Sequence, residues 1–345
     1  MPDIEHKILV WLPSPMGDAI LSTPALRAIR NHFKKSKITF YGNKIVRQVL
    51  SPNNFNDAWL QQHNKNLFKT SALLKKQNFS TAILFKNSFA SALACFLARI
   101  PVRIGYAREA RSLFLTEKPN PLRLPNGKFK PLSMLDYYLA IASRLGCETN
   151  DRTIELFIDP QDSKTLKDKL PQLTGKSSPV VIMVPGGAFG PSKCWPSERF
   201  AETADRLISK YKATVIISVS QSAAEKRIAG QICTASSNKL INLAENPLTI
   251  GQIKSLFSIV DLVITNDTGP RHIAIAFKRN VITLFGPNDP AWTETGWQNE
   301  IKIVGKAACA PCTKPVCKEN QHWCMEDITV DAVCDAADKL LTQNI

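Results

Sequence analysis

The sequence predicts an α/β protein that consists of two doubly wound, Rossmann-like domains. Short apolar segments rich in β-branched residues alternate with helical segments in both halves of the chain, as in parallel sheets whose strands are joined by helices. The length of 345 residues exceeds one ordinary domain and suits two. A polar stretch with prolines, 150–178, separates the halves, so we expect domains at 1–160 and 175–345.

The first half begins with an apolar strand at 8–12 and a turn, after which Asp18 opens a helix. Pro24 lies inside that helical segment, so we expect a kink there. The other elements expected in this half are strands at 37–41 and 81–85 and helices at 43–50, 67–77 and 131–146. Asp18 would then lie at the carboxyl edge of a parallel sheet, where open α/β sheets bind ligands. The alternative role for Asp18 is a plain helix cap, for which Asp is favoured.

The second half restarts the alternation with a strand at 180–184, which leads into a glycine-rich loop, PGGAFGPSKCWP. Gly186 and Gly187 allow backbone N–H groups to approach a phosphate closely, and Lys193 adds a positive charge. The other elements expected here are strands at 214–219, 239–243, 262–265 and 281–285 and helices at 197–210, 222–232, 249–257, 271–277 and 330–341. The loop is therefore a candidate phosphate site, and a long β–α turn without a ligand is the alternative.

The stretch 262–287 organises the second half as a strand–turn–helix–strand unit. Pro270 follows the turn at a first helical position, which tolerates proline because its N–H would have no partner. Thr268 and Gly269, at the helix start, would offer unpaired N–H groups and the positive end of the helix dipole. We therefore expect a second phosphate-binding element here, next to Asp267.

The net charge of +15 is unevenly placed along the chain. Residues 1–160 hold 23 Lys and Arg against 11 Asp and Glu, a balance of +12, whereas residues 161–345 hold 21 against 18, a balance of +3. A basic first half favours an anionic partner such as nucleic acid, a phospholipid surface or a phosphorylated substrate. Because we do not expect the basic segment 86–130 to carry the interleaved exposed aromatic residues of single-strand binders, we rank lipid phosphate above nucleic acid and expect no nucleic-acid partner. A solvated basic face without a partner is the alternative.

No apolar run in the sequence approaches the ~18 residues of a membrane span, and the longest candidate, 91–98, ends at Arg99. The N-terminus, MPDIEHK, lacks the basic and apolar regions of a signal peptide. We therefore expect a cytoplasmic protein.

Four stretches, spread from Ile8 to Cys324, resemble motifs of the bacterial heptosyltransferases, glycosyltransferase family 9. NDTGPRHIAIAF…VITLFGP is similar to the family's donor-sugar motif, and PGGAFGPSKCWPSERFAE to its glycine-rich lysine loop. Gly17-Asp18 with the later PAL segment resembles the first motif, and NSFASALACFLARIPVRIGYAREARS resembles the region that faces the acceptor. The resemblance implies the GT-B architecture, in which two Rossmann-like domains face a central cleft.

The resemblance also implies an activity, the inverting transfer of heptose from ADP-heptose to the inner core of lipopolysaccharide on lipid A. Asp18 would be the general base, and Lys193 with the helix start would stabilise the leaving ADP. The donor-binding residues that it implies are Gly186, Gly187, Lys193, Glu225, Asp267, Thr268, Gly269 and His272. Among them, Glu225 would hold the ribose and Asp267 the sugar hydroxyls. His272 would orient the donor loop, unless it is a satisfied core histidine.

The resemblance and the local positive charge indicate Arg108 and Arg111 as the candidate acceptor-binding residues. Arginine forks suit phosphate and carboxylate recognition, and the implied lipid A-core acceptor is phosphorylated. An acceptor embedded in a membrane also implies an anionic membrane surface as a partner. We therefore expect a monomer that is peripheral on the cytoplasmic face of the inner membrane.

No cofactor and no obligatory metal is expected. The turn after the first strand lacks the G-x-G-x-x-G fingerprint of dinucleotide binding, and no D-x-D metal site accompanies the other motifs. Four clustered cysteines, Cys309, Cys312, Cys317 and Cys324, could hold a structural zinc, although a zinc ribbon needs two C-x2-C knuckles. The same stretch resembles one in the second heptosyltransferases of the family. Metal ligation and reduced packing thiols both stay open.

Two other functions remain possible on the sequence alone. One is a GT-B glycosyltransferase that uses a different nucleotide-sugar or acceptor. The other is a binding protein that kept the fold without catalysis, against which the joint presence of Asp18, Lys193 and Asp267 argues.

Overall fold

The computed structural model describes residues 6–62, 66–127, 129–175, 178–319 and 321–342. The chain divides into two compact units, which we call unit 1 (Met1–Phe157 with Ala291–Thr295) and unit 2 (Ile158–Pro290 with Gly296–Ile345). Each unit is built on one parallel sheet with helices between its strands, which confirms the predicted fold class. In the described part of the chain no helix has the length and apolar character that a membrane crossing requires.

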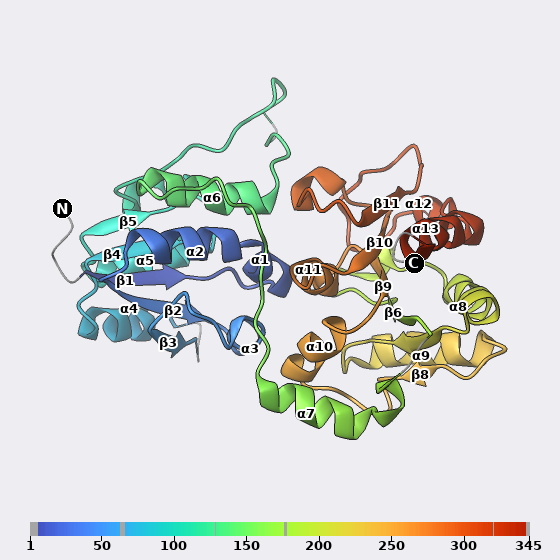
Figure 1. The fold of residues 1–345 in the computed structure, drawn as a ribbon. Helices are drawn as coiled ribbons and strands as arrows, with labels where there is room; N and C mark the ends of the chain where they lie inside the picture. The colour runs from blue at the N-terminus through green and yellow to red at the C-terminus, as the bar shows by residue number, and fades with distance from the viewer. Residues whose placement is uncertain (1–5, 63–65, 128, 176–177, 320, 343–345) are drawn as a thin grey trace. The chain divides into compact units, whose positions relative to one another are not determined.

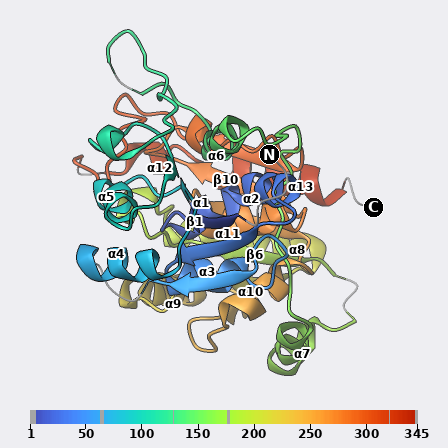
Figure 2. The ribbon, with the colours of Figure 1, turned by 90° about the vertical axis from the view of Figure 1, so that its left-hand side faces the viewer.

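Unit 1 contains a five-stranded parallel sheet in the order β3-β2-β1-β4-β5 (Figure 1). Its strands are β1 Lys7–Trp11, β2 Lys37–Gly42, β3 Ala58–Gln61, β4 Thr81–Leu84 and β5 Val102–Ile104. Its helices are α1 Met16–Leu21, α2 Thr23–His32, α3 Lys44–Leu50, α4 Leu67–Lys76, α5 Phe89–Leu97, the 3-10 helix η1 Ser112–Phe114 and α6 Met134–Arg144. The pair α2 and α6 covers one face of the sheet, and the pair α4 and α5 covers the other (Figure 2).

The helix expected to start at Asp18 and kink at Pro24 is in fact two helices. α1 ends at Leu21 and α2 begins at Thr23, so the break falls at Ser22. Pro24 then lies in the first turn of α2, where its missing N–H costs no hydrogen bond. Asp18 lies in the first turn of α1, whose N-cap is Pro15, so the alternative that Asp18 is the cap residue is wrong.

The change from unit 1 to unit 2 falls between Phe157 and Ile158, ahead of the interval 160–175 expected from composition. Residues before it are tied to unit 1, since Arg27 pairs with Asp151 at 2.9 Å. The polar segment after it forms helix α7, Pro160–Lys169, which belongs to unit 2. α7 packs on α10, Ile250–Phe257, so closely that a Cβ added at Gly251 would collide with the Asp162 carboxylate.

Unit 2 contains a six-stranded parallel sheet in the order β11-β10-β9-β6-β7-β8. Its strands are β6 Val180–Val184, β7 Thr214–Ile217, β8 Ile241–Asn242, β9 Leu262–Asn266, β10 Asn280–Phe285 and β11 Glu300–Val304. Its other helices are η2 Pro171–Leu173, η3 Pro191–Lys193, α8 Ser197–Tyr211, α9 Ala223–Ala235, α11 Gly269–Ala276, η4 Pro290–Thr293 (which ends within the part assigned to unit 1), α12 Trp323–Glu326 and α13 Val330–Thr342. β6, β9 and β10 are buried along their whole length, as expected of central parallel strands.

Trp195, at the end of the glycine-rich loop, anchors the core of unit 2. Its side chain is 1% exposed, and its ring meets that of Phe200 edge to face at 5.0 Å. The indole Nε1 donates to the carbonyl oxygen of Ile328 at 2.9 Å, so the one polar atom of the ring is satisfied. The loop thus ends in a fixed position immediately before α8.

We expect Trp195→Ala to destabilise unit 2 by ~3–5 kcal/mol, because it removes a fully buried aromatic side chain and leaves a cavity. Urea unfolding monitored by circular dichroism measures the loss. Trp323→Ala is the matched control, because Trp323 is 54% exposed and its truncation should change stability by only about 0.5 kcal/mol. Equal losses in the two variants would contradict the anchoring role of Trp195.

Candidate functional site

Two loops that carry sequence motifs meet at the carboxyl edge of the unit 2 sheet. β6 ends at Val184 and runs into the glycine-rich loop, while β9 ends at Asn266, where the turn to α11 begins. The two strands pair in parallel with Val184 opposite Thr265, so their loops leave the sheet side by side. The Asn266 side chain ties the loops together by donating to the carbonyl oxygen of Pro185 at 2.6 Å.

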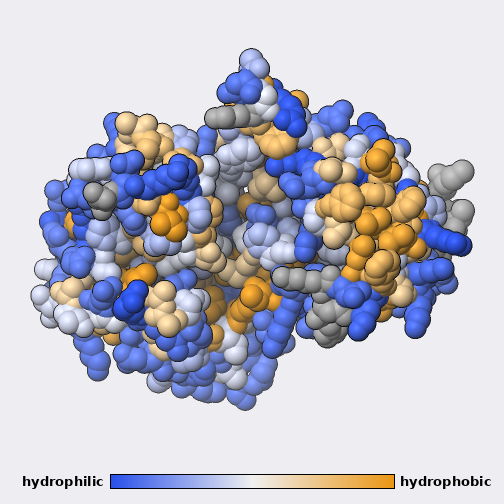
Figure 3. Space-filling model, turned by 180° about the vertical axis from the view of Figure 1, so that it is seen from behind, coloured by the Kyte–Doolittle hydropathy of each residue, from blue (hydrophilic) through white to orange (hydrophobic). Residues whose placement is uncertain are grey.

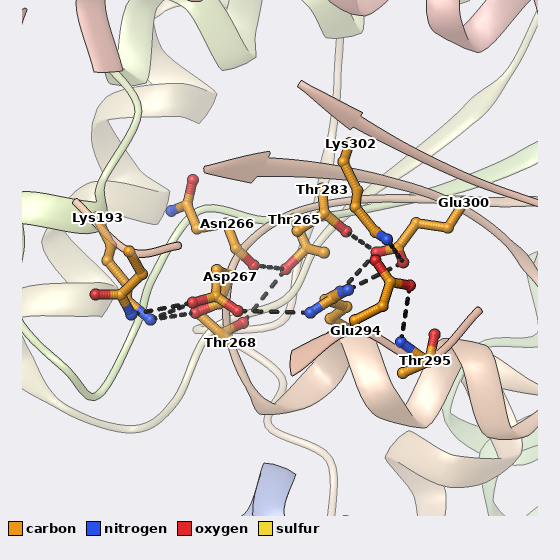
Figure 4. A network of polar contacts seen from close by, with 12 residues as sticks. Lys193, Thr265, Asn266, Asp267, Thr268, Thr283, Glu294, Thr295, Glu300 and Lys302 are labelled. Atoms are coloured by element: carbon orange, nitrogen blue, oxygen red, sulfur yellow. Dashed lines mark hydrogen bonds and ion pairs between the residues drawn. The ribbon is translucent and has the colours of Figure 1, made fainter. Parts of the chain in front are cut away.

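A buried ion pair joins these loops. Lys193 Nζ lies 2.6 Å from Asp267 Oδ2 and donates a second hydrogen bond, 2.8 Å long, to the backbone oxygen of Asp267 (Figure 4). The side chains of Lys193 and Asp267 are 9% and 8% exposed. Removing two charges from water costs several kcal/mol per ion, which only a close contact with additional hydrogen bonds offsets. The Phe189 ring, 4.8 Å from the ammonium, adds a cation–π contact.

A second cation, Arg271, supports Asp267 from the first turn of α11. Its Nη1 lies 3.7 Å from Asp267 Oδ1, and its side chain is fully buried. Glu300 on β11 holds the guanidinium with two hydrogen bonds of 2.6 and 2.9 Å and also accepts from Thr283 Oγ1 at 2.6 Å. Charges of alternating sign therefore run from Lys193 through Asp267 and Arg271 to Glu300.

This surrounding charge keeps Asp267 ionised. Burial alone would raise the pKa of Asp267, but the charge and hydrogen bond of Lys193, together with Arg271, outweigh burial and hold the pKa below its ordinary value. His272 behaves in the opposite way, because burial, reinforced by the charge of Arg271, lowers its pKa to about 3. His272 is therefore neutral near pH 7, and its Nδ1 has no hydrogen-bond partner among the described residues.

The glycines of the loop permit two close approaches. A Cβ added at Gly186 would lie 2.5 Å from Glu225 Oε2, and one at Gly187 would lie 3.0 Å from Thr268 Cγ2. Glu225, in the first turn of α9, is itself held by the N–H of Ser220 at 2.7 Å. The structure thus brings together at one sheet edge the donor-side residues named from the sequence: Gly186, Gly187, Lys193, Glu225, Asp267, Thr268, Gly269 and His272.

This edge of unit 2 has the features of a site for a small anion-bearing ligand. Helix α11 starts at Gly269 with no side-chain cap on its first turn, which leaves the positive end of its dipole for a ligand. A cavity of about 590 Å³ lies alongside and is bordered by Asn288, whose Nδ2 donates to Asp267 Oδ2 at 3.2 Å. That volume is within the range of small-molecule sites.

A second cavity, of about 670 Å³, lies at the carboxyl edge of the unit 1 sheet. Its walls carry polar side chains from strand ends and helix starts, including Trp11, Asn43, Gln62, Thr70, Lys86 and Ser88. The Trp11 side chain is 4% exposed, and its Nε1–H finds no acceptor among the described residues. This cavity was not predicted, because Trp11 reads in the sequence as an ordinary core residue at the end of a strand.

Arg111 stands behind this second cavity and does not face solvent. It is fully buried, with Nε donating to Tyr106 O at 2.9 Å, Nη2 to Asn87 Oδ1 at 2.7 Å, and Nη1 to Lys86 O. The bonds to Lys86 and Asn87 brace the segment 86–88 before α5, and Lys86 and Ser88 of this segment line the cavity. The prediction that Arg111 binds an acceptor phosphate therefore requires correction. The guanidinium is buried, and its N–H groups already donate to acceptors within the protein.

Arg108 and Asp18 are the remaining predicted site residues of unit 1. Arg108 is half-buried and stacks over the Phe129 ring at 4.1 Å. Asp18, also half-buried, follows β1, and its negative charge adds to the rise that burial causes in the pKa of Tyr138. Both belong to unit 1, whereas Lys193 and Asp267 belong to unit 2.

The four clustered cysteines are free thiols, of which Cys309 is exposed and Cys324 is buried. Burial raises the pKa of the Cys324 thiol, and the charges of Cys309, Cys312 and Cys317 raise it further. Over the residues that the structure describes, no group of three or more His, Cys, Asp or Glu side chains is arranged to hold a metal ion.

Comparisons with known proteins place this geometry in context. The model of "Glycosyltransferase family 9 (heptosyltransferase)" matches residues 67–323. Lipopolysaccharide heptosyltransferase 2 of Escherichia coli K12 is 28% identical over 98% of this chain and 99% of its own, and lipooligosaccharide heptosyltransferase 2 of Campylobacter jejuni is 26% identical over 97% and 99%. Among solved structures, E. coli ADP-heptose lps heptosyltransferase II aligns with a TM-score of 0.78 and 25% identity, covering 98% of this chain and 99% of that one. A family 9 glycosyl transferase from Veillonella parvula aligns with a TM-score of 0.83 and 20% identity over 99% of both chains.

The neutral, buried His272 predicts a pH dependence of stability. Its pKa is about 3 in the folded protein against an ordinary 6.5, so the unfolded chain takes up the proton first as the pH falls. The contribution of His272 to the free energy of unfolding is complete above pH 6.5 and should be lost progressively from there toward pH 3, at about 1.4 kcal/mol per pH unit. Urea unfolding at pH 7.5, 6.0 and 4.5 measures the slope, which should be shallower in His272→Gln. If the free energy of unfolding changed equally with pH in the wild type and in His272→Gln, the result would contradict a buried neutral imidazole.

Proposed function

Because the chain belongs to glycosyltransferase family 9, the heptosyltransferase family, we propose that it transfers L-glycero-D-manno-heptose from ADP-heptose to the inner core of lipopolysaccharide on lipid A. The relatives named heptosyltransferase 2, which align along almost the whole chain, support the second heptosyltransferase step. The observation that carries the proposal is the buried Lys193–Asp267 pair at the uncapped start of α11, beside the glycine-rich loop. This arrangement suits a ligand with both a diphosphate and sugar hydroxyls.

In the proposed reaction, unit 2 binds the donor and stabilises the leaving group. The heptose passes through an oxocarbenium-like state while negative charge gathers on ADP. The Lys193 ammonium has three N–H donors, two of which donate to Asp267. A phosphate oxygen can therefore accept a hydrogen bond from the third. The start of α11 adds its dipole. Asp267 and Glu225 would accept from the sugar and ribose hydroxyls, and neutral His272 would support the turn from within α11.

Unit 1 supplies the acceptor side of the proposed reaction. Asp18 would remove the proton from the attacking acceptor hydroxyl, which gives inversion in a single displacement. The cavity at the sheet edge would hold the sugar of the acceptor, with Asn43, Gln62 and the Trp11 N–H, which has no acceptor in the part of the chain that the structure describes. Arg108 would contribute charge toward an acceptor phosphate, and Arg111 would keep the cavity wall in place.

The proposed acceptor is embedded in a lipid leaflet, so the enzyme has to work at a membrane surface. We propose a cytoplasmic protein that associates peripherally with the inner membrane, as a monomer. The balance of +12 over residues 1–160 supports this, because the anionic cytoplasmic leaflet attracts basic surfaces by ~1 kcal/mol for each residue near it.

The proposed activity is tested by incubating the purified protein with ADP-heptose and a panel of truncated lipid A cores, with products identified by mass spectrometry. We expect heptose to be added to a core that already carries one heptose, and activity to persist in EDTA. Parallel reactions with other nucleotide-sugars serve as the control. Transfer from a different donor, with none from ADP-heptose, would assign the protein to another reaction of the same fold.

We expect Asp18→Asn to lower turnover by roughly 10²-fold or more, because the amide keeps the size of the carboxylate but cannot take a proton. The thermal unfolding midpoint of the variant should match that of the wild type. Turnover is measured under saturating donor and acceptor. A folded Asp18→Asn protein with wild-type turnover would exclude Asp18 as the base.

We expect Lys193→Met to weaken ADP binding much more than adenosine binding, since the lost charge faces the diphosphate while the methionine retains the buried stem. Isothermal titration calorimetry with both ligands measures the two losses. Lys226→Met, on helix α9 of the same unit, is a control that removes one positive charge from a more exposed position. Equal losses for ADP and adenosine would mean that Lys193 does not contact the phosphates.

A further inference from the structure

Helix α5 is apolar on the side that it turns toward solvent. Its sequence, FASALACFL, contains no charged residue. Three large side chains at helical spacing, Phe89, Phe96 and Leu97, are 45%, 46% and 37% exposed. A helix that is apolar all round is normally buried, either in a protein core or in lipid. The uncovered side of α5 therefore indicates a surface that is covered in use.

The apolar surface extends onto the neighbouring 3-10 helix η1. The Phe114 ring lies 5.3 Å from that of Phe89 and 5.4 Å from that of Phe96, which joins η1 to α5. Leu113, in the same turn, is 87% exposed. We call Phe89, Phe96, Leu97 and Leu113 the outer face of α5. Figure 3 shows unit 1 with an apolar area in orange that is bordered by hydrophilic side chains in blue. A contiguous exposed apolar group of this kind marks an interaction surface, whereas single residues do not.

Cationic side chains border the outer face. The Arg103 guanidinium lies 5.5 Å from the centre of the Phe96 ring, and the exposed Arg99 follows the helix within two residues. Lys118 is exposed and reaches the carbonyl oxygen of Ser112 in η1 at 3.5 Å. Helix α4, which packs against α5, ends in the exposed Lys75 and Lys76. Large apolar side chains with surrounding Lys and Arg are the composition that binds the interface of an anionic bilayer.

An adjacent flank of α5 borders the cavity of unit 1. Ser88, Ala90, Ser91 and Ala94, from the cap and first two turns, line that cavity. One helix therefore separates the proposed acceptor cavity from an exposed apolar surface.

We infer that the outer face of α5 is the surface through which unit 1 docks on an anionic lipid bilayer. Phe89, Phe96, Leu97 and Leu113 enter the headgroup region, and the exposed Arg99 and Lys118 contact lipid phosphates. Arg103 instead donates to backbone carbonyl oxygens, including that of Phe114, and so holds η1 in place. The cavity next to α5 then opens at the depth of the headgroups, where the sugar of a lipid-linked acceptor is found; this last point rests on the proposed function. A second copy of the chain is a poorer occupant, because two faces with the same basic border repel each other.

The test is sedimentation of the full chain with vesicles of phosphatidylcholine alone and of phosphatidylcholine with phosphatidylglycerol. We expect binding to the anionic vesicles that weakens with salt. In the double variant Leu97→Ser with Leu113→Ser, binding should fall roughly tenfold or more, because burial of each large apolar side chain contributes a factor of that order. Both side chains are exposed, and thermal unfolding verifies the fold of the variant.

The matched control is Ile259→Ser with Val316→Ser, which removes two exposed apolar side chains from unit 2 and should leave vesicle binding unchanged. Equal binding by wild type and the Leu97/Leu113 variant would overturn the inference. It would also be overturned if the wild type sedimented as a dimer in analytical ultracentrifugation and the Leu97/Leu113 variant as a monomer, since the outer face would then bind a second copy.

A transfer assay separates this inference from the proposed function. With a vesicle-bound acceptor, the Leu97/Leu113 variant should lose activity, whereas with a deacylated, water-soluble acceptor it should retain wild-type turnover. Vesicle binding that depends on Leu97 and Leu113 in a protein that transfers no heptose would support the docking surface and refute the proposed function. Normal transfer to both acceptors by the variant would refute the docking surface alone.

Discussion

The buried ion pair between Lys193 and Asp267 is the contact on which the organisation of unit 2 depends. Each charge is removed from water, so the loss of either side chain leaves the other buried charge less well compensated. Asp267 faces two cations, and the second, Arg271, is neutralised in turn by Glu300 on β11. The pairing therefore requires the glycine-rich loop, the turn before α11 and the edge strand β11 to be in place together. A buried cation is in this way fixed at the sheet edge before any ligand arrives.

This arrangement explains why the glycines and the proline stand where they do. Gly186 and Gly187 bring the loop backbone against Glu225 and Thr268, distances that a side chain would prevent. Pro270, in the first turn of α11, gives up an N–H that the helix would not have used. An anionic ligand could accept hydrogen bonds from the remaining N–H groups of that turn and from the third N–H of Lys193. Preorganisation of this kind is effective because the donors need not be desolvated or reoriented when charge develops.

Unit 1 is organised differently from unit 2. Helix α5 borders a polar cavity on one flank and carries an exposed apolar surface on another. The arginines of this unit have different roles. Arg111 is buried and holds the segment that forms part of the cavity wall. Arg103 lies over the Phe96 ring, next to the outer face of α5. Some basic residues of this half therefore support the structure internally, and others supply surface charge. The net charge alone does not tell these two groups apart.

The sequence by itself determined the α/β class, the parallel sheets and the two loops of unit 2, because hydrophobic period and turn chemistry are local properties. The resemblance to a family, carried by the same motifs, indicated Lys193 and Asp267. Only the tertiary structure paired these two residues, added Arg271 and Glu300 as their support, and buried Arg111, since each of these facts depends on residues far apart in the chain. The edge strands β3, β5 and β11 also escaped prediction. β3 and β5 are short and depend on pairing with a neighbouring strand, whereas β11, EIKIV, carries an alternation of apolar residues that could have been recognised in the sequence. The exposure of α5 was likewise decided by packing, because an apolar run reads the same in sequence whether neighbours cover it or leave it to a membrane.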